Sequence, residues 1–154
     1  NWLPAYYEVM SYTMAGFSIE LTPAEKDAYL DLAKETMERL KTMAPKESEV
    51  FALESFYITA RLVINPRERG QTMSGMSIAA AERALSLDAK NPRALYMKLS
   101  NHMGTAQFFG QSMVPYCEKA AIIYADWDNY KMESPFHPTW GKSQLEGILK
   151  SCKK

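Results

Sequence analysis

The chain has 154 residues, of which 47% are apolar and 12% aromatic, so it can bury a hydrophobic core and is neither a disordered nor a fibrous protein. Its 18 basic residues balance 18 acidic ones, which leaves no long-range field to attract nucleic acid or an anionic membrane. No apolar run approaches the roughly 20 residues that span a bilayer, and the first residues lack the basic flank and apolar segment of a signal peptide. We expect one soluble, non-membrane-spanning domain over residues 1–154, without nucleic acid as a partner.

Helical periodicity accounts for the first third of the sequence. Apolar residues recur at intervals of three and four over residues 3–17, which predicts an amphipathic helix. The next helix has clear boundaries: Thr22 is the predicted N-cap, Pro23 occupies the first turn, and Glu25 completes a capping box. This helix is predicted to end near Pro45.

Two further helices are predicted on either side of a loop. The third helix carries apolar residues over 51–62 and breaks before Asn65-Pro66, because the residue before a proline disfavours helical geometry. A loop over residues 65–72 is expected to follow. The fourth helix, over residues 78–87, carries small alanines that predict close packing against another helix.

The remaining helices follow the same pattern. Asn91-Pro92 supplies an N-cap and a proline at the first helical position of the fifth helix. Residues 104–110 are predicted to connect it to a sixth helix that tolerates Pro115 in its first turn. A last helix is predicted over residues 145–152. No segment alternates as a strand does, so the sequence predicts an all-α chain of seven helices.

Comparable positions recur in alternate helices. Leu40, Ala84 and Ala120 lie at similar places in the second, fourth and sixth helices, separated by 44 and 36 residues, against the roughly 34 of a standard tetratricopeptide repeat (TPR). The extra length is assigned to the two predicted loops. The expected fold is therefore a TPR-like α-α superhelix of three degenerate helical hairpins, closed by a C-terminal capping helix.

Four segments resemble small TPR-like proteins of bacterial envelopes, some of them of uncharacterised function. They are INPRERGQ at 64–71, SLDAKNPRALY at 86–96, the pair Phe109-Gly110, and SPFHPTWGK at 134–142. The resemblance covers nearly the whole chain. It implies a right-handed stack of helical hairpins, export from the cytoplasm in at least some relatives, and no established chemistry. We therefore expect a periplasmic or exported protein, with the cytoplasm as the alternative.

The TPR analogy also predicts a binding face, because the first helix of each pair lines the concave side. Side chains of the third and fifth helices would then point into a groove that holds a peptide segment or a partner subunit: Glu49, Phe56, Thr59, Arg93, Tyr96 and Ser100. Arg93 would offer a charge-assisted hydrogen bond, and Tyr96 an aromatic platform. The alternative for Phe56, which we favour, is core packing. The leading hypothesis is a noncatalytic protein-interaction scaffold.

A second candidate site is the predicted loop over residues 65–72. Arg67, Arg69 and Gln71 make it more polar and longer than a simple helix connection requires. Alternatively, Arg69 and Gln71 fasten the loop to neighbouring helix ends. The second functional hypothesis is an envelope protein that binds a small molecule or glycan between this loop and the C-terminal cap, where Trp140 and tyrosines could stack.

The residues that could carry chemistry are few. His102 and His137 are the only histidines, they are not spaced i, i+4, and neither CxxC nor HExxH is present, so we expect no catalytic residue, metal site or cofactor. Cys117 and Cys152 fall at similar heights on two antiparallel helices. Two buried free thiols are the favoured interpretation. A disulfide, the alternative, would add about 3–4 kcal/mol and would indicate an oxidising compartment.

Overall fold

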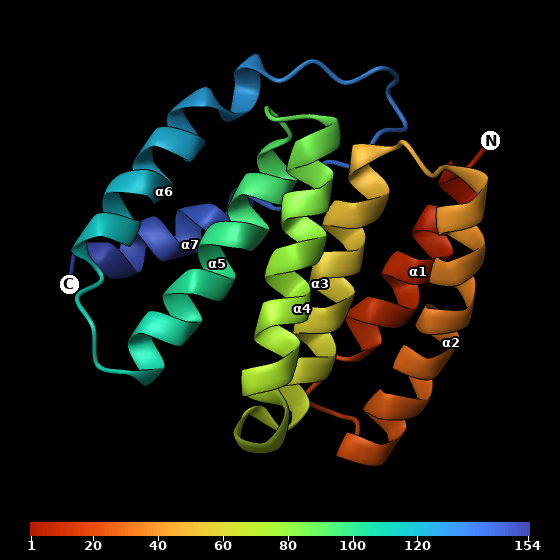
Figure 1. The fold of residues 1–154 in the computed structure, drawn as a ribbon, viewed down its shortest axis with the longest axis horizontal. Coiled ribbons are helices and arrows are strands. Elements are labelled where there is room, and N and C mark those ends of the chain that lie inside the picture. The colour runs from red at the N-terminus through yellow and green to blue at the C-terminus, as the bar shows by residue number, and fades with distance from the viewer.

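The computed structural model describes residues 1–154, and all of its regular secondary structure is helical (Figure 1). The helices are α1 (Leu3–Ala15), α2 (Pro23–Met43), α3 (Ser48–Ile64), α4 (Pro66–Leu87), α5 (Pro92–Phe108), α6 (Val114–Asp126) and α7 (Lys142–Cys152), with a 3-10 turn at Trp127–Asn129. The prediction of seven helices without a strand is confirmed. None of these helices is both long enough and apolar enough to cross a membrane.

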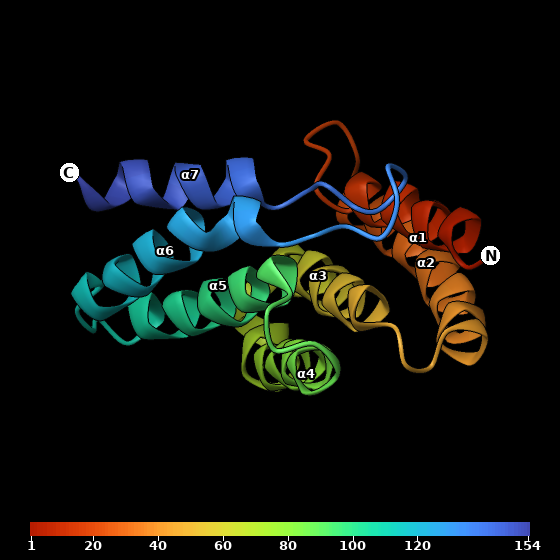
Figure 2. The ribbon, with the colours of Figure 1, turned by 90° about the horizontal axis from the view of Figure 1, so that it is seen from above.

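Helices that follow one another in sequence pack side by side. α1 packs on α2, α3 on α4, α4 on α5, and α6 on α7, while α1 and α5 both also contact α3. Figure 2 shows α1 and α7 on one side of the molecule and α4 on the opposite side, with α3 between α1 and α5. The candidate site described below lies where α1, α3 and the segment before α7 meet.

Local sequence signals set the helix boundaries. The Thr22 hydroxyl accepts from the Glu25 backbone N–H at 3.3 Å, and the Glu25 carboxylate accepts from the Thr22 N–H at 2.7 Å, which is the predicted capping box. The Asn91 side chain accepts from the backbone N–H groups of Arg93 and Ala94, so it caps α5 as expected. These bonds satisfy donors that the first turn of each helix leaves unpaired.

Two clusters of buried apolar side chains form the core. The larger, of 17 buried residues, spans α1 to α5, and the smaller, of 7, spans α4 to α7. Phe56 on α3 packs against both clusters and so joins them. Ala80, Ala81 and Ala84 are buried on α4, which confirms that the small residues of this helix allow close packing.

Both predicted loops are largely helical, which corrects the sequence-based boundaries. Asn65 accepts a hydrogen bond from the Glu68 N–H and caps α4, which begins at once with Pro66. Because proline is well suited to the first turn of a helix, the Asn65-Pro66 pair ends α3 and starts α4 with no intervening loop. Similarly, α5 continues through Gly104 to Phe108, so the connection to α6 is shorter than predicted.

Candidate functional site

Three aromatic rings from distant parts of the chain stack on one another. The rings of Phe17 and Phe56 have centroids 5.1 Å apart at an interplanar angle of 18°, and those of Phe56 and Trp140 lie 5.0 Å apart at 24°. These distances are within the range of offset-stacked aromatic pairs. We call Phe17, Phe56 and Trp140 the aromatic ladder.

Each ring of the aromatic ladder comes from a different element. Phe17 follows the end of α1, Phe56 lies in the middle of α3, and Trp140 precedes α7. The Trp140 indole N–H donates a 2.7 Å hydrogen bond to the hydroxyl of Tyr6 on α1, which fixes the orientation of the indole. Burial raises the pKa of Tyr6, and the nearby Glu49 carboxylate raises it further, so the hydroxyl stays protonated. The ladder is therefore held on a rigid support.

Part of the aromatic ladder is open to solvent. Phe17 is 37% exposed, and Ile19, two residues further along the chain, is 98% exposed. Phe56 and Trp140 are half-buried. Phe17 is stacked yet accessible, and Ile19, two residues further along the chain, is almost fully exposed, so this segment offers apolar contact surface to a flat ligand.

The segment that delivers Trp140, which we call the strap (residues 130–141), is tied to two other parts of the molecule. The Tyr130 hydroxyl lies 2.8 Å from the Asp88 carboxylate at the end of α4, and the Tyr7 hydroxyl on α1 donates to the Phe136 carbonyl at 2.8 Å. Burial, together with the Asp88 carboxylate, raises the pKa of Tyr130, so its hydroxyl remains a donor. The first bond holds the start of the strap to the end of α4, and the second holds its middle against α1 (Figure 2).

The strap ends at Gly141, whose backbone conformation only glycine adopts readily. Its φ is +107°, and a Cβ atom there would lie 2.8 Å from the Trp127 ring.

We expect Gly141→Ala to lower the free energy of unfolding by about 2–3 kcal/mol, through backbone strain and overpacking together. Urea unfolding measures this change. Gly147→Ala is the matched control: this glycine lies within α7 with no atom close to its Cβ position, so we expect stabilisation of about 0.5–1 kcal/mol. Equal effects of the two substitutions would contradict the prediction.

Three of the six residues predicted to line the groove, Glu49, Arg93 and Tyr96, are buried instead. Arg93 and Glu49 form a bidentate ion pair, with Nε–Oε2 and Nη2–Oε1 distances of 2.7 and 2.6 Å. Both side chains are almost completely inaccessible. The expectation that they present a charge to a partner is therefore wrong, because both side chains are buried and the Glu49 carboxylate bonds to the Nε–Nη2 edge of Arg93. Burial opposes the charge of Arg93, but its bonds to Glu49 outweigh burial and raise the pKa.

The other predicted groove residues have different surroundings. Thr59 is half-buried and belongs to a chain of hydrogen bonds with Ser77 and Asn101 that joins α3, α4 and α5. Tyr96 is buried in the smaller core cluster, and Ser100 lies one helical turn further along α5, half-buried. Only Phe56, for which core packing was the favoured alternative, belongs to the aromatic ladder. It both packs in the core and presents part of its ring.

The second predicted site is not a loop. Arg67, Arg69 and Gln71 lie in the first two turns of α4. Arg69 donates two hydrogen bonds, of 2.7 and 2.8 Å, to the carboxylate of Asp27 on α2 and a third to the Arg61 carbonyl, which confirms the fastening role considered for Arg69. These bonds lower the pKa of Asp27 and keep it ionised. Arg67 and Gln71 are exposed and make no such bond, so the fastening role proposed for Gln71 is wrong.

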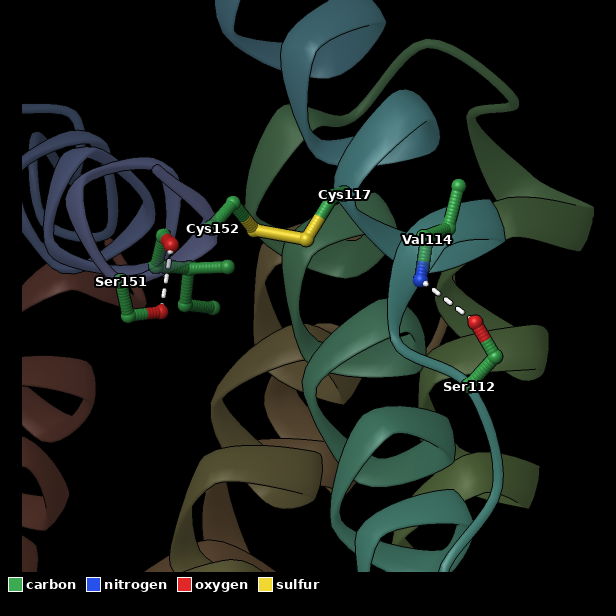
Figure 3. Close-up of a disulfide and its surroundings, with 6 residues drawn as sticks. Ser112, Val114, Cys117, Ser151 and Cys152 are labelled. Carbon is green, nitrogen blue, oxygen red and sulfur yellow. Dashed lines mark hydrogen bonds between the residues drawn. A yellow bond between two sulfur atoms is a disulfide. The ribbon is translucent and has the colours of Figure 1, made fainter. Parts of the chain in front are cut away.

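The two cysteines are joined, contrary to the favoured prediction of free thiols. Figure 3 shows the sulfur–sulfur bond between Cys117 on α6 and Cys152 on α7, whose Cα atoms lie 5.9 Å apart. The two cysteines lie at similar heights on their helices, as the helix geometry predicted. The packing of α7 on α6 then brings the two sulfur atoms within bonding distance.

Two pockets lie away from the aromatic ladder. One, of about 280 Å³, lies between α2, α3 and α4 and has Tyr57 as its single aromatic residue. The other, of about 590 Å³, lies beside the disulfide and is lined by Met113, Val114 and Ala121 among others, with no aromatic residue. Neither pocket offers stacked rings to a flat ligand. The aromatic ladder is therefore the better platform for one.

The sequence contains only a weak signal for the ladder. Phe17 fits the apolar stripe of the first helix, and Trp140, expected to stack at the cap, also packs against the smaller core cluster. The stacking between them depends on residues up to 123 positions apart in the chain. Periodicity reports on single helices and carries no information about such pairs.

Comparison with known proteins gives one informative similarity. No protein-family model matches this chain, and no curated protein matches it. Among solved structures, the chain is similar to the HusA haemophore from Porphyromonas gingivalis, with 26% sequence identity and a TM-score of 0.83. The match covers 99% of this chain and 75% of the haemophore chain. The chain thus shares its all-helical fold with a haemophore over nearly its whole length.

Proposed function

We propose that this chain binds haem, or a closely related porphyrin, without catalysing a reaction, and that the aromatic ladder is the contact surface. The observation that carries the proposal is the fold similarity to a haemophore, with a TM-score of 0.83 over 99% of this chain. This replaces protein-partner binding as the leading hypothesis. It is a specific form of the small-molecule alternative that the sequence left open.

The chemistry of the aromatic ladder suits such a ligand. A porphyrin is a flat, conjugated and largely apolar ring system, and it gains by stacking on aromatic rings and by leaving water. Phe17 and Ile19 supply accessible apolar surface, and the Phe17 ring stacks on Phe56, which in turn stacks on Trp140. Because the ladder contains no metal-ligating side chain, we expect stacking rather than iron coordination to dominate the affinity.

The proposed small-molecule site therefore differs in location from the one predicted from the sequence. The part assigned to residues 65–72 lies in α4, where Arg69 is already bound to Asp27. The part assigned to the cap, with Trp140 as a stacking residue, is retained in the present proposal. An apolar peptide segment bound on the same face remains the second hypothesis, and absence of saturable porphyrin binding in the experiment below would favour it.

We also infer that the helices follow the TPR plan, as three hairpins (α1–α2, α3–α4 and α5–α6) closed by α7. The packing of consecutive helices supports this inference, and so does the Asn-Pro start of α5. In this arrangement the first helix of each hairpin faces the side that carries the aromatic ladder.

We infer that the protein acts outside the cytoplasm, as a periplasmic or exported protein. The Cys117–Cys152 disulfide supports this location, because disulfides persist in oxidising compartments and are rare in the cytoplasm. The similarity to a haemophore also supports it. Fractionation of the source cells, followed by mass spectrometry of the disulfide-linked peptide, tests the location.

The function is tested by titrating the purified, disulfide-intact chain with haem and with metal-free protoporphyrin, monitoring the absorbance of the porphyrin and the fluorescence of tryptophan. We expect both ligands to bind with one saturable affinity. Phe17→Ala is expected to weaken binding about tenfold, because stacking and apolar contact together contribute on the order of 1.4 kcal/mol. The ring is partly exposed, so the variant should retain its helical content.

Phe108→Ala is the matched control, because Phe108 is 82% exposed at the end of α5 and stacks only edge-on with Phe109. We expect this variant to bind both ligands as the wild type does. Absence of saturable binding would overturn the haem proposal, and an equal loss in the two variants would overturn the assignment to the aromatic ladder. If haem binds and metal-free protoporphyrin does not, iron coordination rather than stacking carries the affinity.

A further inference from the structure

A histidine and two glutamates from separate parts of the chain meet beside the strap. Glu47 is the N-cap residue of α3, while Glu133 and His137 belong to the strap. One ligand atom from each of the three side chains lies within 4.8 Å of the other two. Only the folding of the strap onto the start of α3 creates this group.

His137 is directed into the group with one nitrogen unpaired. Its side chain is only 8% exposed, and the ring packs edge-on against Trp2, with centroids 5.6 Å apart. Nδ1 shares a 3.3 Å hydrogen bond with the Ser134 hydroxyl. Nε2 makes no hydrogen bond, and the Glu133 carboxylate oxygen lies 4.0 Å from it. Nε2 is not closed off from solvent, so it is available to an incoming ligand.

The two carboxylates have no lysine or arginine partner. Glu47 is half-buried, and one of its oxygens accepts a hydrogen bond from the Glu49 N–H, which leaves the other oxygen available. Neither Glu47 nor Glu133 forms an ion pair with a lysine or arginine, and the nearby Arg93 is fully engaged by Glu49. Two carboxylates this close repel each other unless a positive charge lies between them.

We propose that Glu47, Glu133 and His137 form a binding site for one divalent transition-metal cation of the Zn²⁺ type. One imidazole nitrogen and two carboxylate oxygens are a donor set that Zn²⁺ accepts, with water as the fourth ligand, whereas Mg²⁺ and Ca²⁺ prefer oxygen donors alone. The hydrogen bond from His137 Nδ1 to Ser134 would orient the imidazole, as the outer partners of metal-bound histidines do.

The group can close around such an ion with little rearrangement. Zinc ligands at about 2.0–2.2 Å from the metal lie about 3.5 Å from one another in a tetrahedral site. The distance from His137 Nε2 to the Glu133 oxygen is longer, at 4.0 Å, but the Glu133 side chain is 83% exposed and free to rotate inward. The bound ion would link the strap to the start of α3. The proposal is independent of haem binding.

The test is isothermal titration calorimetry of the full, disulfide-intact chain with ZnCl₂. A parallel titration with CoCl₂ reports the ligands of the metal through its visible absorption spectrum. We expect one metal ion per chain. His137→Gln and Glu133→Gln should each weaken binding by at least about tenfold. The matched controls are His102→Gln and Glu118→Gln, which remove the other histidine and an exposed glutamate on α6, and both should bind as the wild type does.

A second measurement does not depend on the titration itself. ZnCl₂ should raise the thermal midpoint of the wild type and slow amide hydrogen exchange over residues 131–140, and should do neither in Glu133→Gln, an exposed position whose substitution leaves the fold intact. The proposal is overturned if no stoichiometric binding is found, if Glu133→Gln and His137→Gln both bind as the wild type does, or if His102→Gln weakens binding as much as His137→Gln. Haem titrations neither support nor contradict it.

Discussion

Replacing Arg93 by alanine is expected to lower the free energy of unfolding by about 3–5 kcal/mol, because the substitution leaves the Glu49 carboxylate charged and unpaired in the core. The Arg93 side chain is 2% exposed, and it makes both of its short bonds to Glu49. The guanidinium also lies 5.7 Å from the centre of the Tyr130 ring, so its loss removes a contact to the strap. Urea unfolding followed by circular dichroism measures the change.

Two comparisons make this prediction specific. Arg39→Ala removes an arginine that is also paired with a glutamate, Glu8, but by a single bond and with a side chain 61% exposed, so it should cost no more than about 1 kcal/mol. Arg93→Met combined with Glu49→Leu removes both charges and fills the space with apolar atoms, so it should recover most of the lost stability. A small effect of Arg93→Ala, or a double variant as unstable as the single one, would show that the pair is not a buried ionic contact.

The buried Arg93–Glu49 pair also decides which variants are suitable for a binding test. Arg93 would be the natural residue to mutate if it were taken as a ligand contact. Because its removal is expected to destabilise the whole fold, a loss of binding in an Arg93 variant would report on folding. Substitutions at Phe17 avoid this problem, since its ring is partly exposed and stacks on Phe56 alone.

Loss of the Cys117–Cys152 bond is expected to lower the free energy of unfolding by about 3–4 kcal/mol, because it releases a closed loop of 35 residues in the unfolded chain. The loss should be largest at the C-terminus. α7 packs chiefly on α6, and the bond joins these two helices near the end of the chain (Figure 3). Urea unfolding with and without a thiol reductant measures the change, and hydrogen exchange locates it.

The control is the Cys117→Ala, Cys152→Ala double variant. Its stability should match that of the reduced wild type and should not respond to the reductant. Amide protection should fall in α6 and α7 while α2 and α3 keep theirs, because the larger core cluster does not include α7. A reductant effect below about 1 kcal/mol, or a uniform loss of protection, would contradict the prediction.

The helices themselves could be predicted from short stretches of sequence. Thr22 and Glu25 define the start of α2, and Asn91-Pro92 defines the start of α5, because capping and the proline ring act within one turn. The same local signals misled at Asn65-Pro66. A proline that breaks one helix is equally suited to start the next, so the pair was interpreted as a loop where the structure places the first turn of α4.

The candidate site could be predicted only in part. The position of Phe56 on the third helix predicts that it lines a binding face, and Trp140 is predicted to stack at the C-terminal cap. Glu49 and Arg93 were named for the same reason as Phe56 and proved to be buried. A helical pattern gives the side of a helix on which a residue lies, but it does not say whether a neighbouring helix covers that side.

The sequence by itself determined the all-α class, the number of helices, most of their boundaries and the level at which the two cysteines lie on their helices. Only the tertiary structure decided which distant side chains meet: Phe17 with Phe56 and Trp140, Glu49 with Arg93, and Glu47 with His137. The reason is physical. Helix formation and capping depend on residues within about four positions of one another, whereas these contacts depend on how each helix is rotated and packed against its neighbours, which the whole core decides at once.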